Sequence, residues 1–319
     1  LSYWNSSMPA AIPMRRFVTK QIAIVALLPV AIIALLVWLI LIPQLRTSIG
    51  IQQHTLARTI AGEVSAHLMG GERQLAALAQ ATLSPSDYSP QQLTTLLDIA
   101  CGEGDLFEAI YMVAEGTRTI SSIGLVRLSR FRREDFLGID LSSRDLYQKA
   151  REEKKTVWSK TFLSTVSSRL AVAVALPLPN GVIIGEIRLD RLSEIISRLP
   201  TQAELSILVL DDQGRVVADS RRQRWGQQMA LKQLRADQSK GDTAAQPLLV
   251  DGERQMGSMV AVAGLGWEVL VSQTTASVYR PIQTMFMTIA AGLALTLAVA
   301  LVLAWRQAEA LTIPVRRYT

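Results

Sequence analysis

The sequence predicts an α+β protein in which two stacked αβ modules rest on a long N-terminal helix, flanked by two transmembrane helices. Two long apolar segments, 22–42 and 282–304, lie near the two ends of the 319-residue chain. An amphipathic segment follows the first of them, and two units with a similar order of strands and turns lie between the segments. Repetition of mixed units at this scale is typical of stacked modules.

The two apolar segments are long enough to span a membrane. Residues 22–42 hold 20 apolar residues and Pro29 without a charge, which makes a helix about 31 Å long. The segment is longer than the apolar region of a signal peptide, which favours an uncleaved anchor. Residues 282–304 hold 18 apolar residues in 23, also without a charge, with a buried core helix as the alternative. We expect the natural start at Met14.

The positive charge of the chain belongs to the flanks of these segments. The net charge is +6, and the pI is about 9.7, but residues 43–281 carry only +1. A nearly neutral domain is a poor nucleic-acid binder, since that affinity depends on neutralising phosphates.

The basic residues that flank the two apolar segments predict the orientation. By the positive-inside rule they indicate cytoplasmic termini and an external segment 43–281. The flanking basic residues are Arg15, Arg16, Lys20, Arg306, Arg316 and Arg317.

Residues for metal or nucleophilic catalysis are scarce. Cys101 is the single cysteine, so no disulfide forms within the chain, and we expect it to be a small buried apolar residue. The two histidines, His54 and His67, are 13 residues apart in one helical segment and do not make a metal pair or a triad. We therefore expect no catalytic residues, no metal and no cofactor.

A long outer helix is predicted to continue from the first apolar segment. Its apolar residues recur in steps of three, four and seven, which indicates one apolar stripe. The stripe predicts a homodimer seam, with packing on the domain itself as the alternative, and Gly70-Gly71 is expected to bend or loosen the helix. The stripe consists of Leu45, Ile49, Leu56, Ile60, Val64, Leu68, Leu75 and Leu78.

The remaining external segment reads as two strand-rich units. Pro179-Asn180-Gly181 is a hairpin signal between two strands, and the segment 205–217 repeats the strand, turn, strand order of 110–120. The predicted strands of the first unit are Phe107–Ala114, Arg118–Leu125, Thr156–Thr165, Leu170–Leu178 and Val182–Leu189, and the predicted helices are Gln91–Ile99, Ser143–Glu153 and Arg191–Leu199.

The order of these elements resembles the double Cache sensors of bacterial transmembrane receptors, whose modules are PAS-like. The sequence segments that carry the resemblance are Asp140-Leu-Ser-Ser-Arg144-Asp-Leu-Tyr147, Val157-Trp158-Ser159, Ala171-Val-Ala-Val, Gly181-Val-Ile-Ile-Gly-Glu-Ile-Arg-Leu189 and Leu192-Ser-Glu-Ile-Ile196. After the second apolar segment, Leu311-Thr-Ile-Pro314-Val-Arg-Arg317 is similar to the opening of a HAMP linker.

The resemblance implies a ligand site in the first module. Amino-acid-binding members use a Tyr, then Arg-x-Trp-Tyr-x-x-Ala, then a Tyr and an Asp. Arg144, Tyr147 and Ala150 match this pattern, whereas Ile139 and Leu146 stand at the Tyr and Trp positions. Glu186 falls at the Asp position, and Tyr111 and Trp158 are expected on strands that line the same cavity. These departures favour a carboxylate or another small polar solute over an amino acid.

Alternatives remain for the site residues. Asp140, Arg144 and Asp145 together can form an ion pair at a helix start, with Tyr147 packed on the core. In the functional interpretation Arg144 offers a bidentate fork to a carboxylate, and Glu186 answers an ammonium group.

The predicted function is an external small-molecule sensor that passes a helix shift to a cytoplasmic kinase, diguanylate cyclase or chemoreceptor module. Residues 43–281 are then periplasmic or extracellular, with both termini on the cytoplasmic side of a bacterial inner membrane. The alternative is a membrane-anchored structural or assembly protein. The predicted parts are the N-terminus (1–21), span one (22–42), outer helix (43–82), distal module (83–200), proximal module (201–281), span two (282–305) and HAMP-like start (306–319).

Overall fold

The computed structural model separates the chain into two compact parts, residues 49–274 and residues 1–48 with 275–319. The described positions are 28, 32, 35, 36, 39, 40, 42–82, 88–102, 106–126, 132–198, 205–221, 223–224, 226–229, 246–250 and 252–312. Most of predicted span one, and Pro314, Arg316 and Arg317 of the HAMP-like start, lie outside the described residues.

Helix α2 (Ile42–Ala81) is the predicted long helix. Its apolar stripe is used by the domain itself, because Ile60, Val64, Leu68 and Leu75 are all at most 2% exposed in the core of residues 49–274. The structure therefore shows that these four residues pack on the domain itself, which was the alternative to a dimer seam. The homodimer stays a prediction, and this part of the stripe does not support it.

Gly70 and Gly71 do not interrupt α2, which is helical through both residues. A Cβ at Gly71 would lie 2.6 Å from Ile187 Cδ1, whereas nothing lies within 4 Å of one at Gly70. Gly71 thus lets the helix approach the sheet closely, a requirement that helix propensity alone does not reveal.

The distal module is built on a six-stranded antiparallel sheet in the order β2-β1-β6-β5-β3, with β4 also pairing with β5. The predicted hairpin is confirmed, since β5 and β6 pair in register from Ala171↔Arg188 to Leu178↔Gly181. Its strands are β1 (Phe107–Ala114), β2 (Ile120–Leu125), β3 (Val157–Trp158), β4 (Phe162–Leu163), β5 (Leu170–Leu178) and β6 (Gly181–Arg188).

The predicted strand 156–165 was wrong as a single element, because it is divided into β3 and β4. Ser159 marks the break. Its hydroxyl accepts the N–H of Ala173 at 2.8 Å, so a side chain takes over a ladder position next to β3. Local hydrogen bonding by serine competes with the strand ladder in this way.

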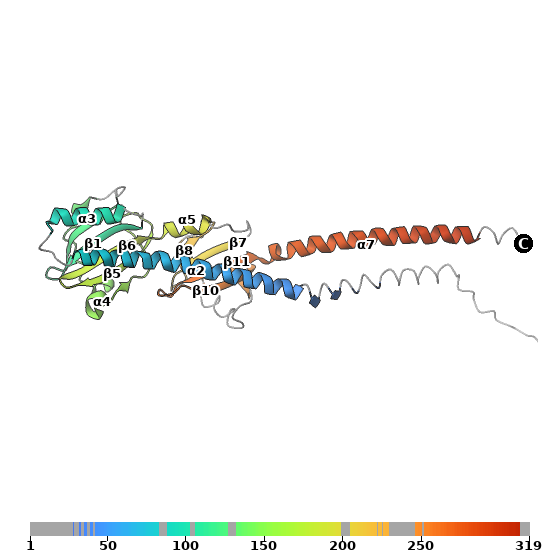
Figure 1. The fold of residues 1–319 in the computed structure, drawn as a ribbon, viewed down its shortest axis with the longest axis horizontal. Coiled ribbons are helices and arrows are strands. Elements are labelled where there is room, and N and C mark those ends of the chain that lie inside the picture. Colours follow the sequence, from blue (N-terminus) through green and yellow to red (C-terminus); the bar gives the residue numbers. More distant parts are fainter. Residues whose placement is uncertain are drawn as a thin grey trace, which may run out of the picture. The chain divides into compact units, whose positions relative to one another are not determined.

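Helices cover both faces of the distal sheet (Figure 1). Helix α3 (Pro90–Gly102) begins with a reciprocal cap, in which Ser89 Oγ accepts the Gln92 N–H and Gln92 Oε1 accepts the Ser89 N–H. It packs with α2 on one face. Helix α4 (Asp145–Glu153) packs on the other, which we call the α4 face. A short 3-10 helix, η3 (Arg133–Asp135), precedes α4.

The proximal module repeats the topology of the distal one. Its sheet has the order β8-β7-β11-β10-β9, so the last strand again pairs with the first, whose hairpin partner is at the edge. Helix α5 (Asp190–Arg198) connects the modules. The proximal strands are β7 (Leu205–Leu210), β8 (Val216–Asp219), β9 (Gln246–Val250), β10 (Glu253–Ala261) and β11 (Glu268–Thr274). The predicted internal repeat is thereby confirmed.

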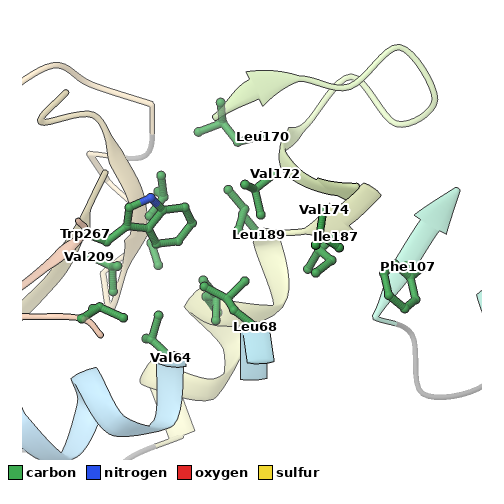
Figure 2. Packing of buried hydrophobic residues seen from close by; sticks show 14 of the residues in the cluster. Val64, Leu68, Phe107, Leu170, Val172, Val174, Ile187, Leu189, Val209 and Trp267 are labelled. Atoms are coloured by element: carbon green, nitrogen blue, oxygen red, sulfur yellow. The ribbon is translucent and has the colours of Figure 1, made fainter. Parts of the chain in front are cut away.

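One hydrophobic core runs through both modules along α2. Figure 2 shows Val64 and Leu68 of α2 packed below Leu189 of the distal module and Val209 and Trp267 of the proximal module, and all five belong to one buried cluster. Burial of this continuous apolar surface is the main favourable term in holding the modules together.

Helix α7 (Thr275–Thr312) follows β11. Its segment Thr275–Val299 is long and apolar enough to cross a membrane, and the described side chains from 283 to 299 are exposed or half-buried. Among the described residues, this is the one helix that meets those two criteria of length and composition.

Candidate functional site

The candidate site is a polar cluster on the α4 face of the distal sheet, a face otherwise formed by apolar and small side chains. Tyr111 of β1 and Glu186 of β6 lie on adjacent antiparallel strands. Tyr111 Oη donates to Glu186 Oε1 at 3.3 Å, and Ser164 Oγ donates to Glu186 Oε2 at 3.4 Å. The apolar neighbours on this face include Ala109, Val113, Ala173, Ala175, Val182 and Ile184.

Glu186 is only 9% exposed, and its pKa is raised to about 7. Burial is the largest cause, the negative charge of Glu108 adds to it, and the hydroxyls of Tyr111 and Ser164 oppose it. Burial likewise raises the pKa of Tyr111, with the Glu186 charge adding and the Arg144 charge opposing. Glu186 therefore exchanges its proton near neutral pH, as groups in binding and catalytic sites often do.

Glu108 was not identified from the sequence. It is 1% exposed, and neither carboxylate oxygen makes a hydrogen bond within the described part of the chain. Burial raises its pKa, and the hydroxyls of Ser164 and Ser167, followed by the charge of Arg188, lower it. Those hydroxyls are near but do not have hydrogen-bond geometry. A charged residue inside the apolar strand Phe107–Ala114 was the available sequence signal.

Arg144 stands at the N-cap position of α4 and is exposed. The ion pair that sequence offered as an alternative does not form. Asp140 instead accepts the N–H of Ser142 at 2.7 Å, and Asp145 pairs with Lys149 at 2.9 Å. The charge of Arg144 lowers the pKa of Tyr111, so the guanidinium acts electrostatically on the polar cluster.

Tyr147 is 2% exposed and packs in the core of the α4 face. Packing was the structural alternative for this residue, and it holds for the ring. Its hydroxyl, however, is buried without a hydrogen-bond partner among the described residues. A buried hydroxyl without a partner is costly, which makes it a candidate for contact with a ligand.

Trp158 is not brought to the α4 face. In β3 it pairs with Val174, and it packs against the core on the α2 side of the sheet. Val157 packs on the α4 face instead. The predicted site residues that the structure brings to one face are Tyr111, Tyr147 and Glu186, with Arg144 at its margin.

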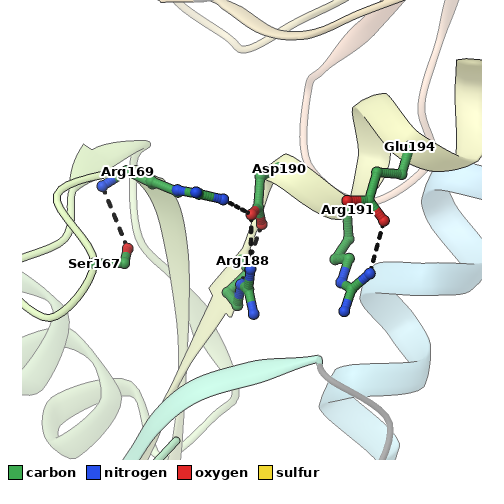
Figure 3. Close-up of polar contacts among 6 residues, drawn as sticks. All are labelled: Ser167, Arg169, Arg188, Asp190, Arg191 and Glu194. Atoms are coloured by element: carbon green, nitrogen blue, oxygen red, sulfur yellow. Dashed lines mark hydrogen bonds and ion pairs between the residues drawn. The ribbon is translucent and has the colours of Figure 1, made fainter. Parts of the chain in front are cut away.

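A charged network lies just beyond the site, where β6 passes into α5 (Figure 3). Arg188 Nη2 donates to Asp190 Oδ2 at 2.7 Å, and Arg169 contacts the same carboxylate. Burial alone would raise the pKa of Asp190, but the two arginines lower it. Asp190 begins α5, and Ser193 of that helix accepts the N–H of Asp219 in the proximal module at 3.3 Å.

The described part of the chain has no group of three or more His, Cys, Asp or Glu side chains placed to hold a metal ion. Cys101 is buried, its Sγ donates to Gly124 O at 3.4 Å, and burial raises its pKa to about 12. Its predicted place as a small buried residue is confirmed.

Comparison with known proteins identifies the architecture. Residues 42–282 match the sequence family described as Cache domain. No curated protein matches the chain. Among solved structures, the ligand-binding domain of the Pseudomonas aeruginosa PAO1 amino acid chemoreceptor PctC with GABA is 17% identical, with a TM-score of 0.53. The match covers 69% of this chain and 96% of that one.

Two further structures have the same fold. The ligand-binding domain of Campylobacter jejuni chemoreceptor Tlp3 with L-norvaline is 14% identical, with a TM-score of 0.60, covering 75% of this chain and 96% of that one. The ligand-binding domain of Pseudomonas fluorescens chemoreceptor CtaA with L-leucine is 13% identical, with a TM-score of 0.55, covering 74% and 99%. At these identities the likeness concerns the fold.

Proposed function

The chain belongs to the double Cache family, and from this membership we propose that it is the extracytoplasmic sensor of a transmembrane signalling receptor. The observation that carries the proposal is the polar cluster of Tyr111, Glu186 and Ser164 on the otherwise apolar α4 face. Tyr147 packs on the same face, and its buried hydroxyl has no hydrogen-bond partner among the described residues. Incompletely satisfied buried polar groups favour a site that a small polar solute completes.

The residues of the proposed site recognise groups of opposite charge on the ligand. Arg144 offers a bidentate fork to an anionic group of the ligand, such as a carboxylate. Glu186 faces a cationic group, and Tyr147 and Tyr111 contribute hydroxyls and aromatic surface. The solved relatives have GABA, L-norvaline and L-leucine bound, which supports a ligand of this size, with an amino acid as one candidate.

A ligand screen tests the proposal. The purified 319-residue chain in detergent is screened by thermal shift against small carboxylates, amino acids, amines and neutral solutes. A ligand should raise the unfolding temperature, and Arg144→Ala should weaken its binding at least tenfold, the effect of losing a charge-assisted contact of about 2 kcal/mol to the ligand.

Arg151→Ala is the matched control, since Arg151 lies at the other end of α4 and faces Glu115 at 3.6 Å. Equal ligand affinities of wild type and Arg144→Ala would mean that Arg144 does not contact the ligand and has a structural role only. Absence of any ligand would favour the second candidate, a membrane-anchored structural or assembly protein.

The topology of the proposal has two spans, with residues 43–281 outside and both termini in the cytoplasm. The apolar segment of α7 supports the second span, and the basic flanks support the orientation. Alkaline phosphatase fused near Gln213 should be active, and fused after Arg317 inactive. The reverse pattern would contradict the sensor.

Signal transmission follows from two-state binding. A ligand shifts the receptor only if it binds the two conformations with different affinity. The expected readout is a displacement of span two against span one of about 1–2 Å, passed through a HAMP-like segment to a kinase, cyclase or chemoreceptor module. A homodimer is expected, and its interface is not assigned to α2.

A further inference from the structure

The polar cluster contains two buried carboxylates side by side, and the backbone explains how. In the β1–β6 ladder Phe107 pairs with Ile187, but Ala109 pairs with Glu186. One extra residue in β1 therefore makes a β-bulge, in which both Glu108 and Ala109 stand opposite Glu186. Bulges re-aim side chains in this way and are frequent next to active sites. Without the bulge, strand alternation would point Glu108 and Ala109 to opposite faces.

Neither carboxylate has an ion-pair partner among the residues that the structure describes. No described Lys or Arg forms an ion pair with Glu108 or Glu186. Arg188, which acts on Glu108, is held by Asp190 through bonds of 2.7 and 3.2 Å. Two adjacent buried anions are unfavourable unless a cation or a shared proton compensates them.

The surroundings fit an organic cation. Both oxygens of Glu108 are buried and without hydrogen bonds within the described residues, so they are free to accept. The hydroxyl of Tyr147 is also buried without a hydrogen-bond partner among the described residues. An ammonium group brings three N–H donors, and the rings of Tyr111 and Tyr147 on this face supply the aromatic surface that organic cations favour.

We propose that Glu108 and Glu186 together bind the ammonium group of an organic amine, so that an amine nitrogen is the recognised feature of the ligand. The inference rests on the proposed sensor function and assigns Glu108 a binding role that the family resemblance does not give it. The charged and titratable groups around the pair are Tyr111 of β1, Arg188 of β6, Asp190 of α5, and Tyr147 and Arg144 of α4.

Three probes of equal chain length test the proposal: 1,4-diaminobutane, 4-aminobutyrate and butyrate. Each is titrated calorimetrically into the full chain in detergent at about pH 8, above the pKa of about 7 of Glu186. Diaminobutane and aminobutyrate should bind, and butyrate should not. Glu108→Gln and Glu186→Gln should each lower diaminobutane affinity at least tenfold, since each removes one charged acceptor.

Glu115→Gln is the matched control, because Glu115 is exposed just after the end of the same strand; it should leave binding unchanged. Unfolding of each variant is measured alongside. Glu108→Gln removes a buried charge and should unfold at no lower temperature than wild type; Glu186→Gln answers the question if that variant does not fold.

Amine binding that survives both glutamine substitutions overturns the proposal, as does failure of both amines to bind. Butyrate binding that Arg144→Ala weakens would also overturn it, while leaving the sensor function intact. Only the absence of every ligand in the broader screen defeats the sensor function itself.

Discussion

The distal and proximal modules share a topology but treat their buried acids in opposite ways. In the proximal module, Asp211 and Asp219 are fully buried, and each accepts at least two backbone N–H groups. Asp219 accepts the N–H groups of Arg221, Gln223 and Arg224, at 2.8–2.9 Å. In the distal module, Glu108 makes no such bond to any described residue. Acids of the first kind hold the turns that follow their strands, whereas Glu108 is the acid that we propose to contact a ligand.

Asp211 combines local and distant hydrogen-bond partners. One of its oxygens accepts the N–H groups of Gln213 and Arg215, and the other accepts the hydroxyl of Thr161 from the distal module. Asp211 directly follows β7 and Asp219 ends β8, so N–H groups of the turns that come next supply most of their partners. Glu108 and Glu186 lie within strands, where the backbone N–H groups are already committed to the ladder.

The largest expected effect is loss of a proximal acid. Asp219→Ala leaves three N–H groups without their charged acceptor and should lower the free energy of unfolding by about 4 kcal/mol. Asp212→Ala, at an exposed neighbouring position, should change it by less than about 0.5 kcal/mol. Thermal unfolding of the full chain measures both. A cost for Asp219→Ala no greater than for Asp212→Ala would remove the contrast between the modules.

The second effect is a pH dependence that belongs to the distal module. Because the pKa of Glu186 is raised in the folded state to about 7, folded protein holds the proton more tightly than unfolded chain. The contribution of Glu186 to the free energy of unfolding is therefore complete below about pH 4.5 and is lost as the pH rises through 7. The loss is on the order of 3 kcal/mol.

Unfolding free energies of wild type and Glu186→Gln, measured between about pH 5 and 8, check this effect. The variant should have a smaller slope over that range, and the slope that is left should include Glu108, whose pKa is also raised by burial. An equal slope in wild type and variant would mean that another group dominates the titration.

The smallest effect compares two hydroxyls. Thr161→Val removes a buried donor to Asp211 and should destabilise by about 1.5 kcal/mol. Tyr147→Phe removes a buried hydroxyl without a described partner and should leave the empty protein unchanged, or stabilise it by up to about 1 kcal/mol, while weakening ligand binding. Destabilisation by Tyr147→Phe as large as that by Thr161→Val would show that its hydroxyl is already satisfied.

Much of the fold was predictable, because it follows from local pattern. Strands β1 and β5 begin and end at the predicted residues, and the turn at Pro179-Asn180-Gly181 joins its strands in the expected register. The matching order of elements predicted the repeat. Glu186 and Tyr147 came from the family resemblance, and Tyr111 from its place on a predicted strand.

The sequence by itself determined which residues alternate along each strand and recur along each helix, since these periods are properties of the local backbone. Only the tertiary structure decided what covers each face. It placed Trp158 on the α2 side, turned the α2 stripe from Ile60 to Leu75 into the domain's own core, and inserted one residue into β1 so that Glu108 reaches Glu186. A bulge shifts the strand phase by one residue, and that shift depends on pairing between segments about 80 residues apart.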